Sequence, residues 1–541
     1  QVIQPKLWMA TEWKLTPWHT IVAGLWALLP VGFLYTFSTF SVALRNALNL
    51  DESQLSTIGA AEIAVSFFIW VPGLIVDRVG ITLALWIGGV SHGISWFLVG
   101  AVAAWRVPIP FPEIAVALLI ASATLSGAFS TGAVFKVLTH NFRKQRAAIV
   151  GIAKAWTGLA AGLMTTVFSG MHGESISDQT QLTYLWYLSA LAFVMPAATS
   201  PFIRMLDNSM IEPAGNAIGA IGDKLLLPVA WRVPVLLAIT LLLASCTAML
   251  SLLEPDIPIN ARHMCSALLP LAVVSPGILL VCKMGRCLLP HQAPGLEDDA
   301  GSLLASALPA SPWECGVAVL VRKSAVWSLL FALFALQSAG FLLTTHLGDI
   351  VESRGMDTAF ASTAVTLFSC AQCLGRVFGG IFSDKAVDLR ITRPWCLVYL
   401  LVQTLISQAV LCLPGRNALI VGVLLGGSAH GMSYPLLVLI VAELFGTKNL
   451  APNYLFVSGT SAACCSVLVS KFLASFVYNA HIGEGERVCY GAGCFRLTYV
   501  GVILIQCAGS LPAIWLAIRS RVVYRATVWI ERNACSVDTH S

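Results

Sequence analysis

The stretch "GLIVDRVG" at 73–80 places an acid and a base, Asp77 and Arg78, directly after a run of residues without charge. A glycine stands four residues before the acid, and another stands two residues after the base. The pattern returns 307 residues later as "GIFSDK" at 380–385. We call 73–80 the first corner and 380–385 the second corner. A repeated acid–base pair in an apolar chain predicts a duplicated architecture.

The composition is that of a membrane protein. Apolar residues make up 57% of the 541 and charged residues 11%, against about 45–50% and about 25% in soluble chains. The net charge of +5 is too small and scattered to indicate nucleic-acid binding. Most of the 15 cysteines stand singly in apolar runs, where cysteine behaves as a small hydrophobe.

A membrane-crossing helix needs about 20 largely apolar residues. The chain offers six such segments, then two weaker ones, then six more, which predicts about fourteen transmembrane helices. The first six are 18–44, 55–76, 82–104, 113–138, 148–170 and 184–205; the weaker pair is 233–253 and 266–288; the last six are 325–347, 358–383, 394–413, 418–440, 452–477 and 497–518.

Loop charge gives this count an orientation, because short cytoplasmic loops are enriched in Lys and Arg. With the N-terminus inside, 21 of the 32 Lys and Arg residues fall in inner segments, 7 in outer segments and 4 within spans. If the chain had only one central helix, the last six spans would be inverted and their Lys and Arg residues would fall mostly in outer loops. We therefore expect both termini on the cytoplasmic side of a plasma or organellar membrane.

Two further matches support a duplication. "GFLYTF" at 32–37 returns as "GFLLTT" at 340–345, and a basic loop follows the fourth span of each half. The corner pattern resembles the signature loop of the major facilitator superfamily. The resemblance implies two six-helix bundles that rock about a cavity, with Gly73, Asp77, Arg78, Gly80, Gly380, Asp384 and Lys385 as gate residues. Plain solvation of a helix end is the simpler alternative.

Other segments resemble the nodulin-like branch of that superfamily, which is related to monocarboxylate-transporter-like proteins. They are "NFRKQRAAIVGIAKAWTGLAAG" at 141–162, "GRVFGGIFSD" at 375–384, "VAELFGTKN" at 441–449 and "CYGAGCFRLTYV" at 489–500. The resemblance implies a central helical pair between the bundles, which agrees with the two weaker spans. It does not imply a substrate.

These observations divide the chain into five parts. Residues 1–17, with Trp8 and Trp13, suit an interfacial segment and show no cleavable-signal pattern. The first bundle covers 18–206, and 207–324 form a linker with two extra helices and a cytoplasmic loop. The second bundle covers 325–520, and 521–541 form a cytoplasmic tail. The two extra helices are expected to pack outside the cavity, which the first, fourth and fifth helices of each half would line.

Ionisable side chains at bilayer depth are costly and therefore mark functional positions. Lys154 and Arg376 are candidates to bind substrate, because a guanidinium can hold a carboxylate through two hydrogen bonds. Lys136 is a third candidate. The alternatives are snorkelling or structural pairing for the two lysines, and support of the second corner for Arg376.

Glu62 is the one clear acid inside a predicted span. A buried carboxyl can take up and release a proton near neutral pH, so Glu62 is a candidate for proton coupling, as is His92. Pairing near the outer surface is the alternative for Glu62. Tyr35, Tyr434 and His430 are candidates to line the cavity, and a simple packing role is the alternative for each histidine.

Cys489 and Cys494 share one loop and are expected to form a disulfide rather than a metal site. The sequence contains no phosphate-binding glycine loop, HExxH helix or serine elbow. An enzyme is therefore not expected, and no cofactor or metal is predicted. The sequence predicts a secondary transporter for a small organic anion or zwitterion, with protons as the coupling hypothesis. A non-transporting receptor or assembly subunit with the same fold is the alternative.

Overall fold

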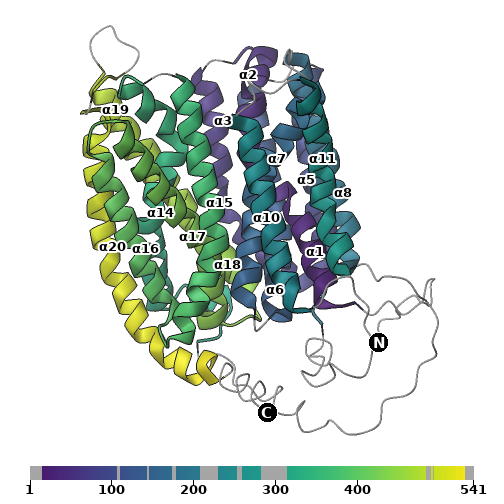
Figure 1. The fold of residues 1–541 in the computed structure, drawn as a ribbon, viewed down its shortest axis with the longest axis vertical. Helices are drawn as coiled ribbons and strands as arrows, with labels where there is room; N and C mark the ends of the chain where they lie inside the picture. Colours follow the sequence, from purple (N-terminus) through teal and green to yellow (C-terminus); the bar gives the residue numbers. More distant parts are fainter. Residues whose placement is uncertain are drawn as a thin grey trace, which may run out of the picture.

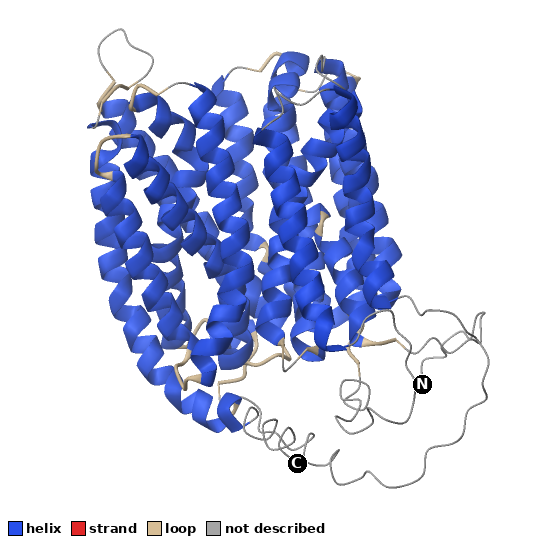
Figure 2. Cartoon of the chain, in the orientation of Figure 1, coloured by secondary structure: helices blue, strands red, loops and turns tan. Residues whose placement is uncertain are grey.

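The computed structural model describes residues 15–50, 52–105, 110–142, 145–172, 178–206, 229–252, 259–281, 313–356, 358–482, 489–491 and 493–530. Within these ranges nearly all regular structure is helical (Figure 2). Most of the interfacial segment expected at 1–17 lies outside them. So do parts of the expected linker and tail.

The first half contains six helical spans, of which the first two are interrupted. Span one is α1 (Pro17–Leu28), η1 (Pro30–Thr36) and α2 (Phe37–Leu48); span two is α3 (Glu52–Ala64), η2 (Val65–Phe68) and α4 (Trp70–Val79). Four continuous helices complete the half: α5 (Ile81–Ala104), α6 (Pro112–Asn141), α7 (Arg146–His172) and α8 (Asp178–Thr199), with η3 (Ser200–Phe202) after α8. The break in the first span falls at Pro30, which cannot donate a backbone hydrogen bond.

The middle of the chain and the second half are also helical. The extra pair is α10 (Val229–Leu252) and α11 (Ile259–Val281). The second half is α13 (Val317–Leu320), α14 (Ser324–Ser353), α15 (Thr358–Asp388), α16 (Arg393–Leu411), α17 (Arg416–Phe445), α18 (Leu450–Cys464), the π-helical η5 (Cys465–Ala474), α19 (Ser475–Ala480) and α20 (Gly493–Ala526).

Eleven helices in the described ranges are long and apolar enough to cross a membrane. Only shorter apolar stretches, Pro17–Phe33 and Leu268–Val281, represent two of the other expected spans. The multi-pass helical fold is therefore as predicted, and the number fourteen stays a prediction.

The helices run side by side along one axis (Figure 1). Within the first half α5 packs on α6 and α8; within the second, α15 packs on α17 and α14 on α20. The halves meet where α7 packs on α15 and where α4 packs on α18. Both contacts join a second helix of one half to a fifth helix of the other, as a duplicated bundle requires.

Glycines allow the two halves to approach closely at the end where α17 and α20 finish, at the bottom of Figure 1. A Cβ on Gly73 of α4 would lie 2.7 Å from Pro452 Cα of α18. A Cβ on Gly380 of α15 would overlap the Ala147 carbonyl of α7. Backbones in such contact exclude larger side chains. Both corners therefore lie at the end where the halves are tightly closed, which we call the corner end.

Candidate functional site

A cavity of about 970 Å³ lies between the two halves. Its wall includes residues from α6 and α7 of the first half and from α14, α15, α17 and α18 of the second. Hydroxyl groups are frequent in this wall, and its described residues include no Asp or Glu. Lys154 and Arg376 both belong to it. The wall is wider than expected, because residues of α3 and α5 in the first half and of α15 in the second contribute to it as well as the first, fourth and fifth helices.

Lys154 lies on α7 and crosses to the other half. Its Nζ donates a hydrogen bond to Tyr454 Oη on α18. The same nitrogen lies 4.4 Å from the centroid of the Phe135 ring and 4.9 Å from that of Tyr454. Aromatic faces attract a cation, so these rings position the ammonium group without neutralising its charge.

Arg376 lies on α15, about two turns before Asp384 of the second corner. Its Nη2 donates to Gln372 Oε1 at 3.2 Å, and its Cζ lies 4.9 Å from the centroid of the Tyr434 ring. A Cβ on Gly158 of α7 would overlap the guanidinium, so this glycine makes room for it. Its Nε has no hydrogen-bond partner in the described part of the chain.

Lys154 and Arg376 are 8% and 5% exposed, respectively. Their charged groups both lie near the Tyr434 ring, with Lys154 Nζ 5.9 Å and Arg376 Cζ 4.9 Å from its centroid. Neither forms an ion pair with any carboxylate among the described residues. Uncompensated buried charge is costly, and an anion between these groups would relieve that cost.

The other candidates divide between the cavity and its surroundings. His92, His430 and Tyr434 line the cavity. His430 Nε2 lies 3.1 Å from Tyr434 Oη, and its ring packs against Phe341. The side chains of Tyr35 and Glu62 lie outside the described part of the structure.

Lys136 does not line the cavity. Its Nζ donates to Asp77 Oδ1 at 2.5 Å, which makes it the partner of the first corner's acid. Arg78, the base that follows Asp77 in sequence, is exposed to solvent. The first corner therefore pairs its acid with the fourth helix of its own half, not with its sequence neighbour.

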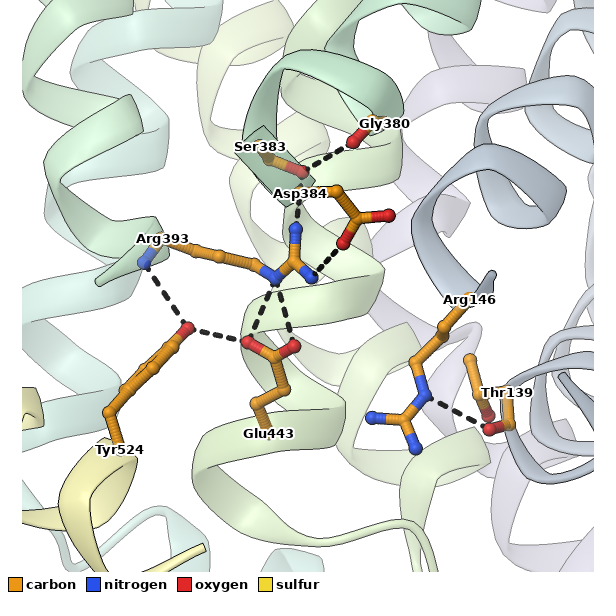
Figure 3. A network of polar contacts seen from close by, with 8 residues as sticks. All are labelled: Thr139, Arg146, Gly380, Ser383, Asp384, Arg393, Glu443 and Tyr524. Carbon is orange, nitrogen blue, oxygen red and sulfur yellow. Dashed lines mark hydrogen bonds and ion pairs between the residues drawn. The ribbon is translucent and has the colours of Figure 1, made fainter. Parts of the chain in front are cut away.

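The second corner is held by a buried network (Figure 3). Arg393, 1% exposed at the start of α16, donates to Asp384 Oδ1 at 2.7 Å and to both Glu443 carboxylate oxygens at 2.9 Å. It also donates to Ser383 Oγ. Lys385 is exposed and stands outside these contacts.

Tyr524 completes the network from α20, because its hydroxyl donates to Glu443 Oε2 at 2.5 Å and accepts from the Arg393 backbone at 3.2 Å. Four helices of the second half are thereby tied together at the corner end (Figure 3). Sequence reasoning missed Arg393, Glu443 and Tyr524. An available signal was Glu443 itself, an acid just after the apolar stretch at 418–440.

At the opposite end, Cys489 and Cys494 form a disulfide across five sequence positions. The described residues contain no cluster of three or more His, Cys, Asp or Glu side chains that could hold a metal ion.

Known proteins resemble this chain in sequence and in fold. Residues 17–275 match the family described as Nodulin-like, and residues 312–526 match the NFD4 C-terminal domain. Protein NUCLEAR FUSION DEFECTIVE 4 of Arabidopsis thaliana is 22% identical over 96% of this chain and 91% of its own length. The uncharacterized MFS-type transporter YhjX of Escherichia coli is 28% identical over 25% of this chain and 33% of its own.

Among solved structures, the major facilitator proton:xylose symporter XylE superposes with a TM-score of 0.53 at 14% identity. The match covers 92% of this chain and 94% of that one. At this identity the likeness concerns the fold.

Proposed function

This chain belongs to the nodulin-like family of the major facilitator superfamily, and from that premise we propose that it carries a small organic anion by alternating access. The observation that carries the proposal is the pair of buried cations, Lys154 and Arg376, in a cavity between two closely packed halves. The sequence allowed a zwitterion as well. The absence of a described acid from the wall favours the anion, because an ammonium group would lack a partner there.

The two cations come from opposite halves, which suits alternating access. Lys154 belongs to α7 and Arg376 to α15, and these helices pack against each other across the interface. An anion held by both would favour the state in which the halves are close at the level of the site. Substrate binding would thereby be linked to rocking of the bundles.

Uptake of labelled carboxylates, and of amino acids with the same carbon skeletons, into proteoliposomes tests the proposal. We expect carboxylates to be preferred. Arg376→Ala and Lys154→Ala should each reduce carboxylate uptake about 10- to 100-fold, since a hydrogen bond to a charged group contributes about 1.5–3 kcal/mol. Arg376→Lys should restore only part of the carboxylate uptake, because a lysine ammonium group cannot bind a carboxylate in a bidentate manner.

Lys471→Ala is the matched control, because this lysine is exposed and does not line the cavity. Unchanged carboxylate uptake in both Arg376→Ala and Lys154→Ala would refute the anion assignment. Preference for the amino acids would favour the zwitterion instead.

We further propose proton coupling through His92 or Glu62. His92 is buried beside Phe33 and Trp96 at the cavity wall, with ring centroids 6.5 Å away in each case. An inward proton gradient should accelerate uptake, and His92→Gln or Glu62→Gln should abolish that acceleration while leaving exchange of labelled for unlabelled substrate. If an inward proton gradient does not change uptake by the unmodified protein, proton coupling is contradicted.

A further inference from the structure

One face of α10 is buried along its whole described length. The buried residues recur every three or four positions, as expected for a single helical stripe: Arg232, Leu236, Thr240, Leu243 and Thr247. The opposite face is exposed, with Trp231, Leu242 and Met249 each about 60% exposed. An exposed apolar face on a membrane-spanning helix suits contact with lipid. The stripe, in contrast, contains two hydroxyl groups and a charge.

Tryptophans attach α10 and α11 to the first half. Trp156 Nε1 of α7 donates to Thr240 Oγ1 at 2.9 Å, and both side chains are buried. Trp26 Nε1 of α1 donates to the Val273 carbonyl of α11 at 3.0 Å. The Arg232 guanidinium lies 5.1 Å from the Trp18 ring centroid. Three specific polar or cation–π contacts therefore join the extra pair to α1 and α7.

Contact between α10 and the second half is of another kind. Leu237 and Ala244 of α10 pack with Cys373 and Val377 of α15 in a small apolar cluster. No hydrogen bond or ion pair between α10 and α15 is present among the described residues. A smooth apolar contact without directional bonds allows one helix to slide along the other.

Toward its C-terminal end α10 also lines the cavity. Ala244, Thr247, Ala248 and Leu250 all line it. The expectation that the extra helices lie outside the cavity is therefore wrong for α10. The Thr247 hydroxyl donates to the Leu243 carbonyl at 2.8 Å, which leaves its oxygen lone pairs able to accept a hydrogen bond from a solute.

We propose that α10 is a wall of the transport cavity that belongs to the first half, and that Thr247 and Ala248 help to determine which solutes fit. The helix closes the cavity where α7 and α15 meet, and it remains fixed to α7 while α15 moves along it. This inference rests on the proposed function in treating the cavity as the transport site, but its geometry is testable without flux.

Thiol labelling provides that test in the full-length protein. Cysteines replace Ala248, Thr344 of α14, which also lines the cavity, and Ala238, which is exposed on the lipid side of α10. Cys370 and Cys373 are changed to serine because they line the cavity too. A membrane-impermeant methanethiosulfonate is added to both sides. We expect Ala248→Cys and Thr344→Cys to react at similar rates, and Ala238→Cys to react at least tenfold more slowly.

The outcomes separate the two proposals. If Thr344→Cys reacts and Ala248→Cys is as slow as Ala238→Cys, α10 is not a wall and the inference is overturned. If Ala248→Cys reacts but no carboxylate in the transport panel slows the reaction or is taken up, the wall is supported and the proposed substrate fails. If neither cavity cysteine reacts, both proposals are contradicted.

Large side chains at Ala248 and Ala238 test whether α10 helps to select the substrate. Ala248→Trp should reduce uptake of the larger carboxylates at least tenfold, with shorter ones less affected, because the indole occupies cavity volume. Ala238→Trp makes the same change on the lipid side and should leave uptake unchanged. Equal effects of the two tryptophans, at equal amounts of protein in the membrane, would count against a selective role.

Discussion

Arg393 is the residue on which the closed second corner depends most directly. It is fully buried and bonded to two carboxylates from different helices. Removing one member of a buried ion pair costs more than the pair contributes, since the partner charges stay buried without compensation. The pair of Arg393 and Glu443 is 1% and 3% exposed, whereas Lys136 and Asp77 of the first corner are 13% and 16% exposed, so water can replace the contact of the first corner more easily than that between Arg393 and Glu443.

We expect Arg393→Met to destabilise the protein by about 3–5 kcal/mol, the usual cost of leaving a buried charge unpaired. Thermal unfolding of purified protein in detergent measures the change as a lower melting temperature. Lys385→Met removes a neighbouring positive charge that is exposed, and should leave the melting temperature nearly unchanged. Equal melting of the two variants would show that the network contributes little.

Opening one corner should also alter the balance between the two ends of the cavity. Because Arg393 ties Asp384 to the fourth helix of the second half, Glu443→Gln should loosen the same contact with a smaller loss of stability. Thr157 of α7 lines the cavity. We expect faster thiol labelling of Thr157→Cys from the corner end in Glu443→Gln than in the parent carrying Thr157→Cys alone. If Glu443→Gln does not change the labelling rate of Thr157→Cys, the network does not control opening of the corner end.

At the scale of elements, the contact between α7 and α15 depends on residues without side chains. Gly151 and Gly380 face each other's helices, and a Cβ on Gly151 would lie 2.8 Å from the Arg376 carbonyl oxygen. Such backbone contact is possible only with glycine, because the backbone cannot yield as a flexible side chain would. The same helices carry the two cavity cations, so the spacing of the site follows from this packing.

Gly380→Val should therefore force α15 away from α7 at the corner end. Overpacking of this kind typically costs about 1–3 kcal/mol, and about 1.4 kcal/mol changes a population ratio tenfold. Thiol labelling of Thr157→Cys from the corner end should rise roughly tenfold. Gly348→Val is the control, because a Cβ there meets nothing within 4 Å. If the labelling rate rises equally in Gly380→Val and Gly348→Val, the contact between α7 and α15 does not control opening of the corner end.

At the scale of the molecule, the halves are expected to rock while α10 stays with the first. Spin labels at Ala238 of α10, Leu83 of α5 and Ile406 of α16 report this, because all three positions are exposed. When carboxylate or a pH gradient changes the state, the 238–406 distance should change and the 238–83 distance should not. A constant 238–406 distance with a changing 238–83 distance would place α10 with the second half.

The sequence by itself determined the class of protein, the duplication and the positions of the unusual charges. Each of these features can be recognised within a short stretch of sequence. Apolar runs indicate helices that cross the bilayer, and a repeated motif indicates duplicated helix ends. Lys154 and Arg376 could be singled out for the same reason, since a charge inside an apolar span is visible without knowing its neighbours. The family resemblance and the helical fold are confirmed by the comparisons.

Only the tertiary structure decided which groups meet. Lys154 and Tyr454 are 300 positions apart, Trp156 and Thr240 are 84 apart, and Arg393 and Glu443 are 50 apart. Hydropathy says that a helix spans the membrane, but not which face it turns to lipid or to a cavity. That choice depends on helix packing and on glycine contacts between distant segments. The corner network and the place of α10 in the cavity wall therefore became visible only in the folded chain.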